Sequence, residues 1–412
     1  MNAPAPSPYR WWVLANAFVI QFIVTGLSWN YVIMLVPEIL ADLSLDLESW
    51  GLLWGSMSLG VCLVAILAGA LADRYGVRLI VGAGLLLGAG SLLVRTELTG
   101  LWDMFATLVV FGVGMGTLFS NLPKALGIWF PPQQLGLATG VYMAGMGLGI
   151  ATLGLAIGDL IELFGGWREL STALGWTTLG LAVLWVLTIR SGEVATDNEV
   201  PPVEGVLRVM RLRSVWILTA CYFLFVGADL SWAGYIITFL TEVRGMPDET
   251  AGLFLIVFSW TFMAGSILLP MFSDRIGRRK PVFMLGVGSA GACILAVPLL
   301  SGLPLMFIAA GLGICLGAIA LVFIVPLEMN PPGPRLAGSA VGVSITGGFA
   351  GGFVGPVISM KLASIDPFIA FAFWCVCYLA AMALFATLRE TGPAANKPAK
   401  EAVAASALRE TA

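Results

Sequence analysis

The stretch GALADRYGVR at residues 69–78 decides how the chain is interpreted, because a second version, PMFSDRIGRR, follows at residues 270–279. Both versions carry an aspartate, a basic residue, one further residue and a glycine, and both lie between long apolar segments. Two shorter pairs share this spacing of about 200 residues: LSW at 27–29 and 230–232, and PP at 131–132 and 331–332. Three matches at nearly one spacing indicate a duplicated chain with two homologous halves.

The composition places most of the chain in a lipid bilayer. Of the 412 residues, 59% are hydrophobic and 11% are charged, whereas soluble proteins carry about 25% charged residues. Apolar segments long enough to span a membrane occur at about 11–36, 49–72, 79–98, 102–129, 136–160, 169–190, 214–240, 250–272, 281–300, 304–327, 337–362 and 367–389. Helix is the state in which such a segment satisfies its own backbone in lipid. The sequence therefore predicts an all-α polytopic membrane protein with twelve transmembrane helices in two six-helix bundles.

The distribution of positive charge predicts the orientation of the chain. An even number of spans puts both termini on one side, and sixteen arginines and lysines fall on that side against four on the other. This bias places both termini in the cytoplasm. We expect the protein to be a multi-pass protein of the cell inner (plasma) membrane. The longest polar break predicts four parts: an N-terminal bundle (1–190), a cytoplasmic linker (191–213), a C-terminal bundle (214–390) and a cytoplasmic tail (391–412).

The duplicated loop resembles the signature of the major facilitator superfamily. That pattern is Gly, three residues, Asp, a basic residue, any residue, Gly and further basic residues. The two copies match it at Gly69, Asp73, Arg74, Gly76 and Arg78, and at Asp274, Arg275, Gly277, Arg278 and Arg279, while Val77 and Pro270 depart from it. The resemblance covers the twelve spans, the linker and the doubled loop. It implies a secondary transporter that works by alternating access, and not an enzyme.

The family resemblance also implies that the loop aspartates gate the cytoplasmic side. Asp73 is expected to face the N-terminal end of helix eleven, and Asp274 that of helix five, because a helix N-terminus carries partial positive charge. Such contacts form when the cytoplasmic side closes and break when it opens. The predicted gating residues are Asp73, Arg74, Arg78, Asp274, Arg275 and Arg279. The alternative is that the arginines only hold the loop in the cytoplasm.

Ionisable side chains inside spans indicate where function lies, and Lys124 is the first of them. It lies seven residues before the first PP pair, roughly 10 Å into the membrane. Asn121 shares its helical face, and Pro123 loosens the turn between them. An amide beside an ammonium is typical of an anion or carboxylate site, and position 324, the counterpart of Lys124, is isoleucine. The alternative is that Lys124 snorkels to the headgroups.

Asp229 is the second ionisable side chain inside a span, roughly 22 Å from the cytoplasmic end of helix seven. Gly26 stands at the matching position of helix one. We predict that Asp229 carries a coupled proton or pairs with a cation. The charged residues near span ends are explained by snorkelling: Arg95, Asp159, Glu328 and Lys361.

Polar and aromatic residues of helices one and seven complete the predicted site. Trp29 and Asn30 in helix one, and Trp232 and Tyr235 in helix seven, are expected to line the outer cavity or a gate. The alternative is that the aromatic rings anchor the helices at the headgroup level. Gln21, at the midplane of helix one, is a further candidate for binding the solute.

Two transport functions remain open. The first is a porter for a small organic or inorganic anion, in which Lys124 supplies the charge and Asp229 a coupled proton. WFPP at 129–132 and GLATG at 136–140 are similar to the anion-handling branches of the superfamily, including cyanate, nitrate and monocarboxylate porters. The second is a porter for a cation or zwitterion such as choline or an amine, with Trp29, Trp232 and Tyr235 as an aromatic cage beside Asp229.

The expected partners are therefore a small solute, with a coupled proton in the first case, and the lipid bilayer. The chain has no histidine and no cysteine spacing typical of a metal site. We expect no metal, no cofactor and no nucleic acid, and we expect a monomer.

Overall fold

The computed structural model describes residues 8–130, 132–190, 202–321, 325, 328–329 and 336–392. In these residues, twelve helices are long and apolar enough to cross a membrane. Each of the twelve predicted segments overlaps one of them. The predicted fold class is confirmed. Position 324, residues 331–332 and the linker residues 191–201 lie outside the described residues, and the predicted boundaries between the four parts stay predictions.

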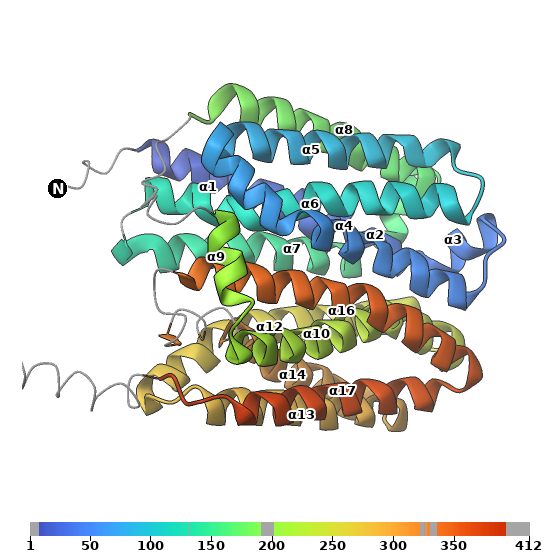
Figure 1. Ribbon diagram of the computed structural model, residues 1–412. Coiled ribbons are helices and arrows are strands. Elements are labelled where there is room, and N and C mark those ends of the chain that lie inside the picture. The colour runs from blue at the N-terminus through green and yellow to red at the C-terminus, as the bar shows by residue number, and fades with distance from the viewer. Residues whose placement is uncertain are drawn as a thin grey trace, which may run out of the picture.

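The spanning helices form two groups that follow the order of the chain (Figure 1). The first group, drawn from blue to green, contains α1 (Tyr9–Ile20), α4 (Leu47–Tyr75), α5 (Val77–Val94), α6 (Leu101–Trp129), α7 (Pro132–Phe164) and α8 (Trp167–Thr188). The second contains α10 (Arg213–Ala233), α12 (Asp248–Ile276), α13 (Lys280–Ala296), α14 (Gly302–Leu316), α16 (Ala337–Ile365) and α17 (Pro367–Thr387). The first described helix begins, and the last one ends, at the same end of the molecule, which we call the terminal face; the other end is the opposite face.

The short helix α9 (Pro202–Val209) lies at the terminal face and packs on the second group (Figure 1). Val209 is buried in a small cluster with Val215, Ala340 and Val343. The end of the linker therefore rests on α10 and α16 through apolar side chains.

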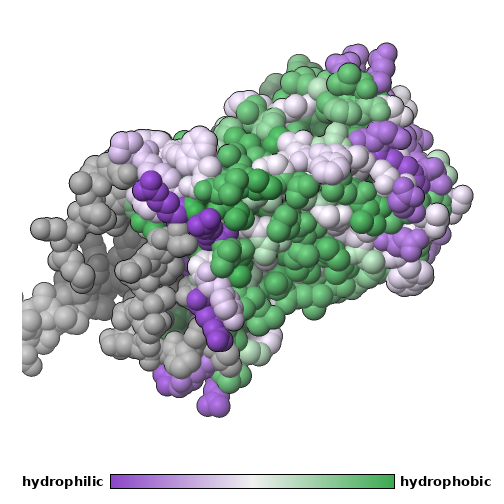
Figure 2. All heavy atoms as spheres, turned by 90° about the horizontal axis from the view of Figure 1, so that it is seen from above, coloured by the Kyte–Doolittle hydropathy of each residue, from purple (hydrophilic) through white to green (hydrophobic). Residues whose placement is uncertain are grey.

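The outer surface suits a bilayer. Figure 2 shows hydrophobic residues over a broad middle region, and hydrophilic residues gathered toward the two ends. Large apolar side chains that point outward include Leu155 and Leu187, which are 76% and 74% exposed. Such exposure is expected where lipid tails are the solvent.

Glycine lets helices within each half pack backbone against backbone. A Cβ atom on Gly112 of α6 would lie 2.0 Å from the carbonyl oxygen of Met57 in α4. A Cβ atom on Gly313 of α14 would lie 2.5 Å from the carbonyl oxygen of Phe258 in α12. Both residues of the second contact follow those of the first by 201 positions. The duplication seen in the sequence is therefore also a duplication of this close contact.

We expect Gly112→Ala to lower the melting temperature of the detergent-purified protein. The new methyl group meets a backbone carbonyl, so the helices must separate, at a cost of about 1–3 kcal/mol. The control is Gly90→Ala in α5, where a Cβ atom would meet nothing within 4 Å. Equal melting temperatures for the two variants would contradict the proposed packing constraint.

Candidate functional site

The seventh spanning helix is interrupted where the two groups of helices meet. α10 ends at Ala233, and α11 (Ile236–Thr238) and a π-helical turn η3 (Phe239–Val243) follow. The indole of Trp50 donates to the carbonyl oxygen of Gly234 at 2.8 Å. The indole of Trp54 donates to the carbonyl oxygen of Leu230 at 2.6 Å. Both indoles come from α4, so the first group of helices supplies donors to the interrupted helix of the second.

Close backbone contacts continue this interface toward the opposite face. A Cβ atom on Gly51 would lie 2.6 Å from the carbonyl oxygen of Pro356, and one on Gly55 would lie 2.7 Å from that of Phe353. The hydroxyl of Ser364, near the end of α16, donates to Glu48, near the start of α4, at 3.3 Å. α4 and α16 therefore approach backbone to backbone next to the opposite face, whereas toward the terminal face a Cβ atom on Gly342 would lie 3.9 Å from the Ile66 side chain, an ordinary side-chain contact.

Trp29 lies in an aromatic cluster on this interface. Its ring centroid is 6.1 Å from those of Trp54 and Phe119, and 6.2 Å from that of Phe111. Phe119 in turn stacks on Phe349 of α16 at 5.8 Å. Trp29 is thus placed at the boundary between the two groups, although it is only 6% exposed in this conformation.

Asn30 and Gln21 lie in an irregular part of helix one, where a π-helical segment η1 (Gln21–Ser28) follows α1. The Asn30 amide donates to the carbonyl oxygens of Thr25 and Gly26 at 2.8 and 3.1 Å. The Gln21 amide oxygen accepts from the Thr25 hydroxyl at 2.5 Å. Both side chains therefore support the irregular helix in this conformation, and their predicted role in binding a solute stays a prediction.

Asp229 is partly exposed on α10, beside two buried side chains. Trp232 and Tyr378 are 1% and 0% exposed, and their hydrogen-bonding groups face the Asp229 carboxylate. The Trp232 indole donates to the Tyr378 hydroxyl at 3.0 Å. Helix one has no space for such a group, because a Cβ atom on Gly26 would lie 2.7 Å from the Cα atom of Gly149.

The three rings of the predicted aromatic cage lie in different ring clusters. Trp29 packs as described above, Trp232 packs on Phe258 at 4.9 Å, and Tyr235 packs on Phe239 and Trp374 at 6.0 and 6.1 Å. Within the described part of the chain, no ring contact joins any two of the three cage residues. The structure does not assemble the cage in this conformation.

Lys124 and Asn121 both contact the neighbouring helix of their own group. The Lys124 ammonium donates to the carbonyl oxygen of Gly69 at 3.1 Å. The side-chain amide of the fully buried Asn121 donates to the carbonyl oxygen of Ala68 at 3.2 Å. The two side chains thus share a face as predicted, and that face is turned toward α4. Their contact with a transported anion stays a prediction.

The second copy of the loop motif forms a cluster of charges around Arg279. Its guanidinium Nη1 lies 2.5 Å from Asp274, its Nη2 lies 2.6 Å from Glu328, and its Nε donates to Glu328 at 3.0 Å. The hydrogen bonds to Glu328 raise the pKa of Arg279 most, and the bond to Asp274 raises it further. Burial of the guanidinium lowers the pKa, but by less than these bonds raise it. The expectation that Glu328 snorkels to the headgroups is wrong, because it closes a bidentate pair with a side chain that is 5% exposed.

The first copy of the motif is built differently. Arg78 donates through Nε to the carbonyl oxygen of Val186 at 2.7 Å, and the residue that matches Glu328 is Ile128. Arg74 and Arg275 are exposed. The side chain of Asp73 lies outside the described residues, and the gating role of the six motif residues stays a prediction.

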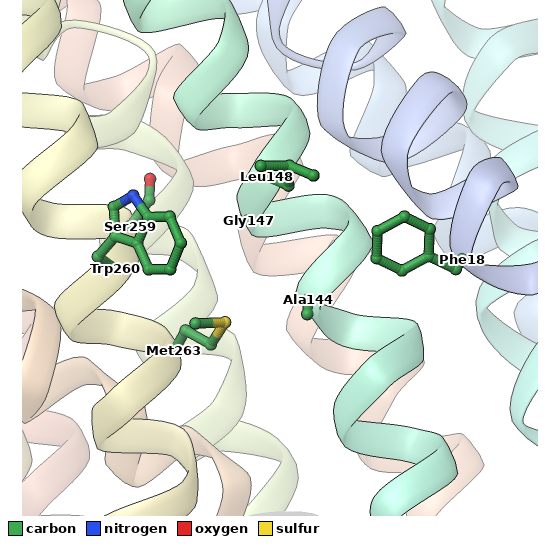
Figure 3. A pocket seen from close by; sticks show the side chains of 7 residues that line it. All are labelled: Phe18, Ala144, Gly147, Leu148, Ser259, Trp260 and Met263. Atoms are coloured by element: carbon green, nitrogen blue, oxygen red, sulfur yellow. The ribbon is translucent and has the colours of Figure 1, made fainter. Parts of the chain in front are cut away.

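A cavity of about 140 Å³ lies where α1 and α7 meet α12 (Figure 3). Its lining residues are Phe18, Ala144, Gly147, Leu148, Ser259, Trp260 and Met263. Ser259 is the one polar side chain among these seven, and its hydroxyl is buried without a hydrogen-bond partner in the described structure. This cavity can hold apolar groups, but its walls supply no charge for an anion.

Sequence reasoning missed two features, one at the interface between the groups and one inside the first group. The donor role of Trp50 and Trp54 was missed because indole side chains in a span are usually interpreted as apolar packing or anchors. Arg95 was expected to snorkel, and that expectation is wrong, because the side chain is fully buried inside the first group of helices.

A family model described as Major Facilitator Superfamily matches residues 17–356 and 215–411. The chain belongs to this superfamily. The resemblance noted in the loop motif is therefore confirmed.

Several proteins that are similar to this chain are named as transporters of anions. The hexuronate transporter of Bacillus subtilis is 23% identical over 392 residues, which cover 88% of this chain and 90% of that protein. The probable nitrate/nitrite transporter NarK2 of Mycobacterium tuberculosis is 26% identical, over 84% of this chain and 87% of that protein. The 4-hydroxybenzoate transporter PcaK of Pseudomonas aeruginosa is 31% identical over 47% of this chain and 43% of its own length.

The superfamily fold is also seen in solved structures. A bacterial homologue of the human lysosomal transporter Spinster, in an inward-facing and occupied conformation, matches with a TM-score of 0.65. The identity is 16%, and the match covers 92% of this chain and 95% of that one. At this identity the likeness concerns the fold.

We expect Glu328→Gln to lower the melting temperature by several degrees. The change leaves the buried Arg279 guanidinium without its bidentate partner, and removing one member of a buried pair costs about 3–5 kcal/mol; the 21% exposure of Glu328 reduces this figure. Arg275→Gln, which removes an exposed charge from the same motif, is the control. If both variants have the melting temperature of the wild type, the charge cluster does not stabilise the terminal face.

Proposed function

We propose that this chain is a proton-coupled secondary transporter that moves a small organic anion across the membrane by alternating access. The observation that carries the proposal is the place of Asp229. Its carboxylate lies inside a spanning helix, is partly exposed, and is faced by donor groups of Trp232 and Tyr378. In the described structure no basic side chain pairs with it, so a proton or a cation must compensate its charge in the membrane.

The names of the relatives support an anion as the solute. Transporters for hexuronate, nitrate or nitrite, and 4-hydroxybenzoate match this chain, two of them over more than four fifths of its length. The cation alternative needs Trp29, Trp232 and Tyr235 around one ligand, and these rings lie in separate clusters. A proton on Asp229 is therefore favoured over a bound organic cation.

The bundle interface supports alternating access. Two indole hydrogen bonds and the glycine contacts of α4 with α16 join the two groups of helices near the opposite face. On the terminal face, the Asp274 carboxylate is 60% exposed and pairs with Arg279 of its own group. We propose that the described conformation is closed at the opposite face, and that this face is the outer one, as the charge distribution predicts.

We expect Asp229→Asn to abolish accumulation of the solute driven by a pH gradient while leaving exchange of internal for external solute. The amide keeps the size and polarity of the side chain but cannot release a proton. The measurement is uptake of labelled 4-hydroxybenzoate and D-glucuronate into proteoliposomes, with and without an imposed gradient. The control is Asp159→Asn, which changes an exposed carboxylate near the end of α7. Gradient-driven uptake by Asp229→Asn at the wild-type level rules out the proton-carrier role.

We expect Trp54→Phe to shift the population of conformations toward opening of the opposite face. The ring is kept and one hydrogen bond of about 0.5–1.5 kcal/mol is lost, which corresponds to a roughly 2- to 10-fold change in the equilibrium. The measurement is the distance distribution between spin labels placed at Glu48 and Ser364. Trp176→Phe, on the exposed face of α8, is the control. Identical distributions in Trp54→Phe and the wild type would show that the indole N–H does not hold the interface.

A further inference from the structure

Arg95 is a buried cation whose guanidinium has no acidic partner among the described residues. It lies in the short turn η2 (Arg95–Glu97) after α5 and is 0% exposed. Its Nη1 donates to the Tyr31 hydroxyl at 2.7 Å, and its guanidinium carbon lies 5.3 Å from the ring centroid of Phe111. In the described part of the chain, its Nε and Nη2 have no hydrogen-bond partner.

The unpaired edge of Arg95 is the one that binds carboxylates. Nε and Nη2 point to the same side of a guanidinium and form a fork that matches the two oxygens of a carboxylate. This protein contains the filled version of that fork, since Nε and Nη2 of the buried Arg279 both bond to Glu328. Arg95 presents the same two nitrogens, and no carboxylate in the part of the chain that the structure describes bonds to them.

Support of the fold does not explain the Arg95 charge. The Tyr31 hydroxyl donates to the Ser171 hydroxyl at 3.1 Å, and the latter donates to the carbonyl oxygen of Leu92 at 2.9 Å. This chain of hydrogen bonds remains complete without Arg95. The guanidinium has the Tyr31 hydroxyl and the rings of Tyr31 and Phe111 beside it, but no carboxylate among the described residues. A cation buried in a membrane protein without an acidic partner is costly and is usually retained for function.

The guanidinium reaches from the opposite face back toward the middle of the membrane. Helical side chains lean toward the N-terminus of their helix, and α5 begins at the terminal face. Phe111, which lies against the guanidinium, follows Leu101 at the start of α6 by ten residues, or about 15 Å. Phe111 also contacts Trp29, Trp29 contacts Trp54, and Trp54 bonds across the interface.

We propose that the Nε–Nη2 edge of Arg95 binds the carboxylate of the transported anion when the opposite face is open. This assignment rests on the proposed anion transport and names the residue that recognises the charge. Opening the face breaks the bond between Trp54 and Leu230 and lets the aromatic cluster move away from Phe111. The anion then compensates Arg95 in the first group of helices, and the proton compensates Asp229 in the second.

The test measures equilibrium binding of 4-hydroxybenzoate and D-glucuronate to the purified full-length protein. Arg95→Gln is expected to weaken binding of the acid that the wild type binds by roughly 10- to 100-fold, as the loss of a charge-assisted bidentate pair implies. Arg95→Lys keeps the charge but not the fork, and its affinity for the acid is expected to lie between those of the wild type and Arg95→Gln. The control is Arg244→Gln on the same face, because the Arg244 guanidinium already donates to the carbonyl oxygens of Pro298 and Leu300.

A second measurement separates a binding role from a structural one. Without ligand, Arg95→Met is expected to melt at or above the wild-type temperature, because the change removes an unpaired buried charge and fills its volume. A melting temperature several degrees lower would make Arg95 a structural support and overturn the proposal. Unchanged affinity of Arg95→Gln would overturn it as well, with anion transport left standing. A wild-type protein that binds neither acid would instead contradict the proposed anion transport, and this site with it.

Discussion

The arrangement of the two bundles depends on the hydrogen bonds that the indoles of Trp50 and Trp54 donate to the interrupted seventh helix. In lipid, apolar surfaces gain little by leaving one set of alkyl chains for another, so bundles associate through close packing and polar contacts. Here both are present at one place, since Gly51 and Gly55 let α4 approach the backbone of α16 beside the two indoles. Each hydrogen bond is weak enough to break, which suits an interface that must open.

The two halves share a frame and differ in their charges. The contact of Gly112 with Met57 returns as that of Gly313 with Phe258, with each residue displaced by the same number of positions. The fork of Arg279 meets Glu328, whereas the matching position in the first half holds Ile128. Duplication preserved the backbone contacts because a changed contact separates helices, while charges could diverge where the two halves do different work.

The two candidate charge sites, Asp229 and Arg95, lie in different bundles. Asp229 occupies a position at which helix one has Gly26, pressed against the backbone of Gly149, so the first bundle could not carry that carboxylate. Arg95 lies in the first bundle, with its guanidinium against the ring of Phe111, which itself contacts Trp29 of the aromatic cluster. In the proposed mechanism each bundle carries one compensated charge, and the relative movement of the bundles couples them.

Much of the fold follows from the sequence alone. Segments of some twenty apolar residues must be helices in lipid, and the repeat of an Asp-basic loop identifies the duplication and the superfamily, because these are local patterns set by backbone hydrogen bonding and by charge at a helix end. Lys124 and Asp229 stand out for the same reason, since a charge inside an apolar run is visible without coordinates.

The contacts that side chains make with neighbouring helices could be identified only from the tertiary structure. Sequence position alone placed Arg95 and Glu328 at span ends, where snorkelling is the ordinary expectation, yet one is buried beside Tyr31 and the other closes the fork of Arg279. Trp50 and Trp54 carry no sequence signal for the carbonyl groups they bind, because those groups lie some 180 residues away in the chain. Which segments cross the membrane, and which charges lie within them, can be inferred from the order of the amino acids. Which of those charges are compensated depends on helix packing, because a charge is compensated by the group that a neighbouring helix presents at the same depth.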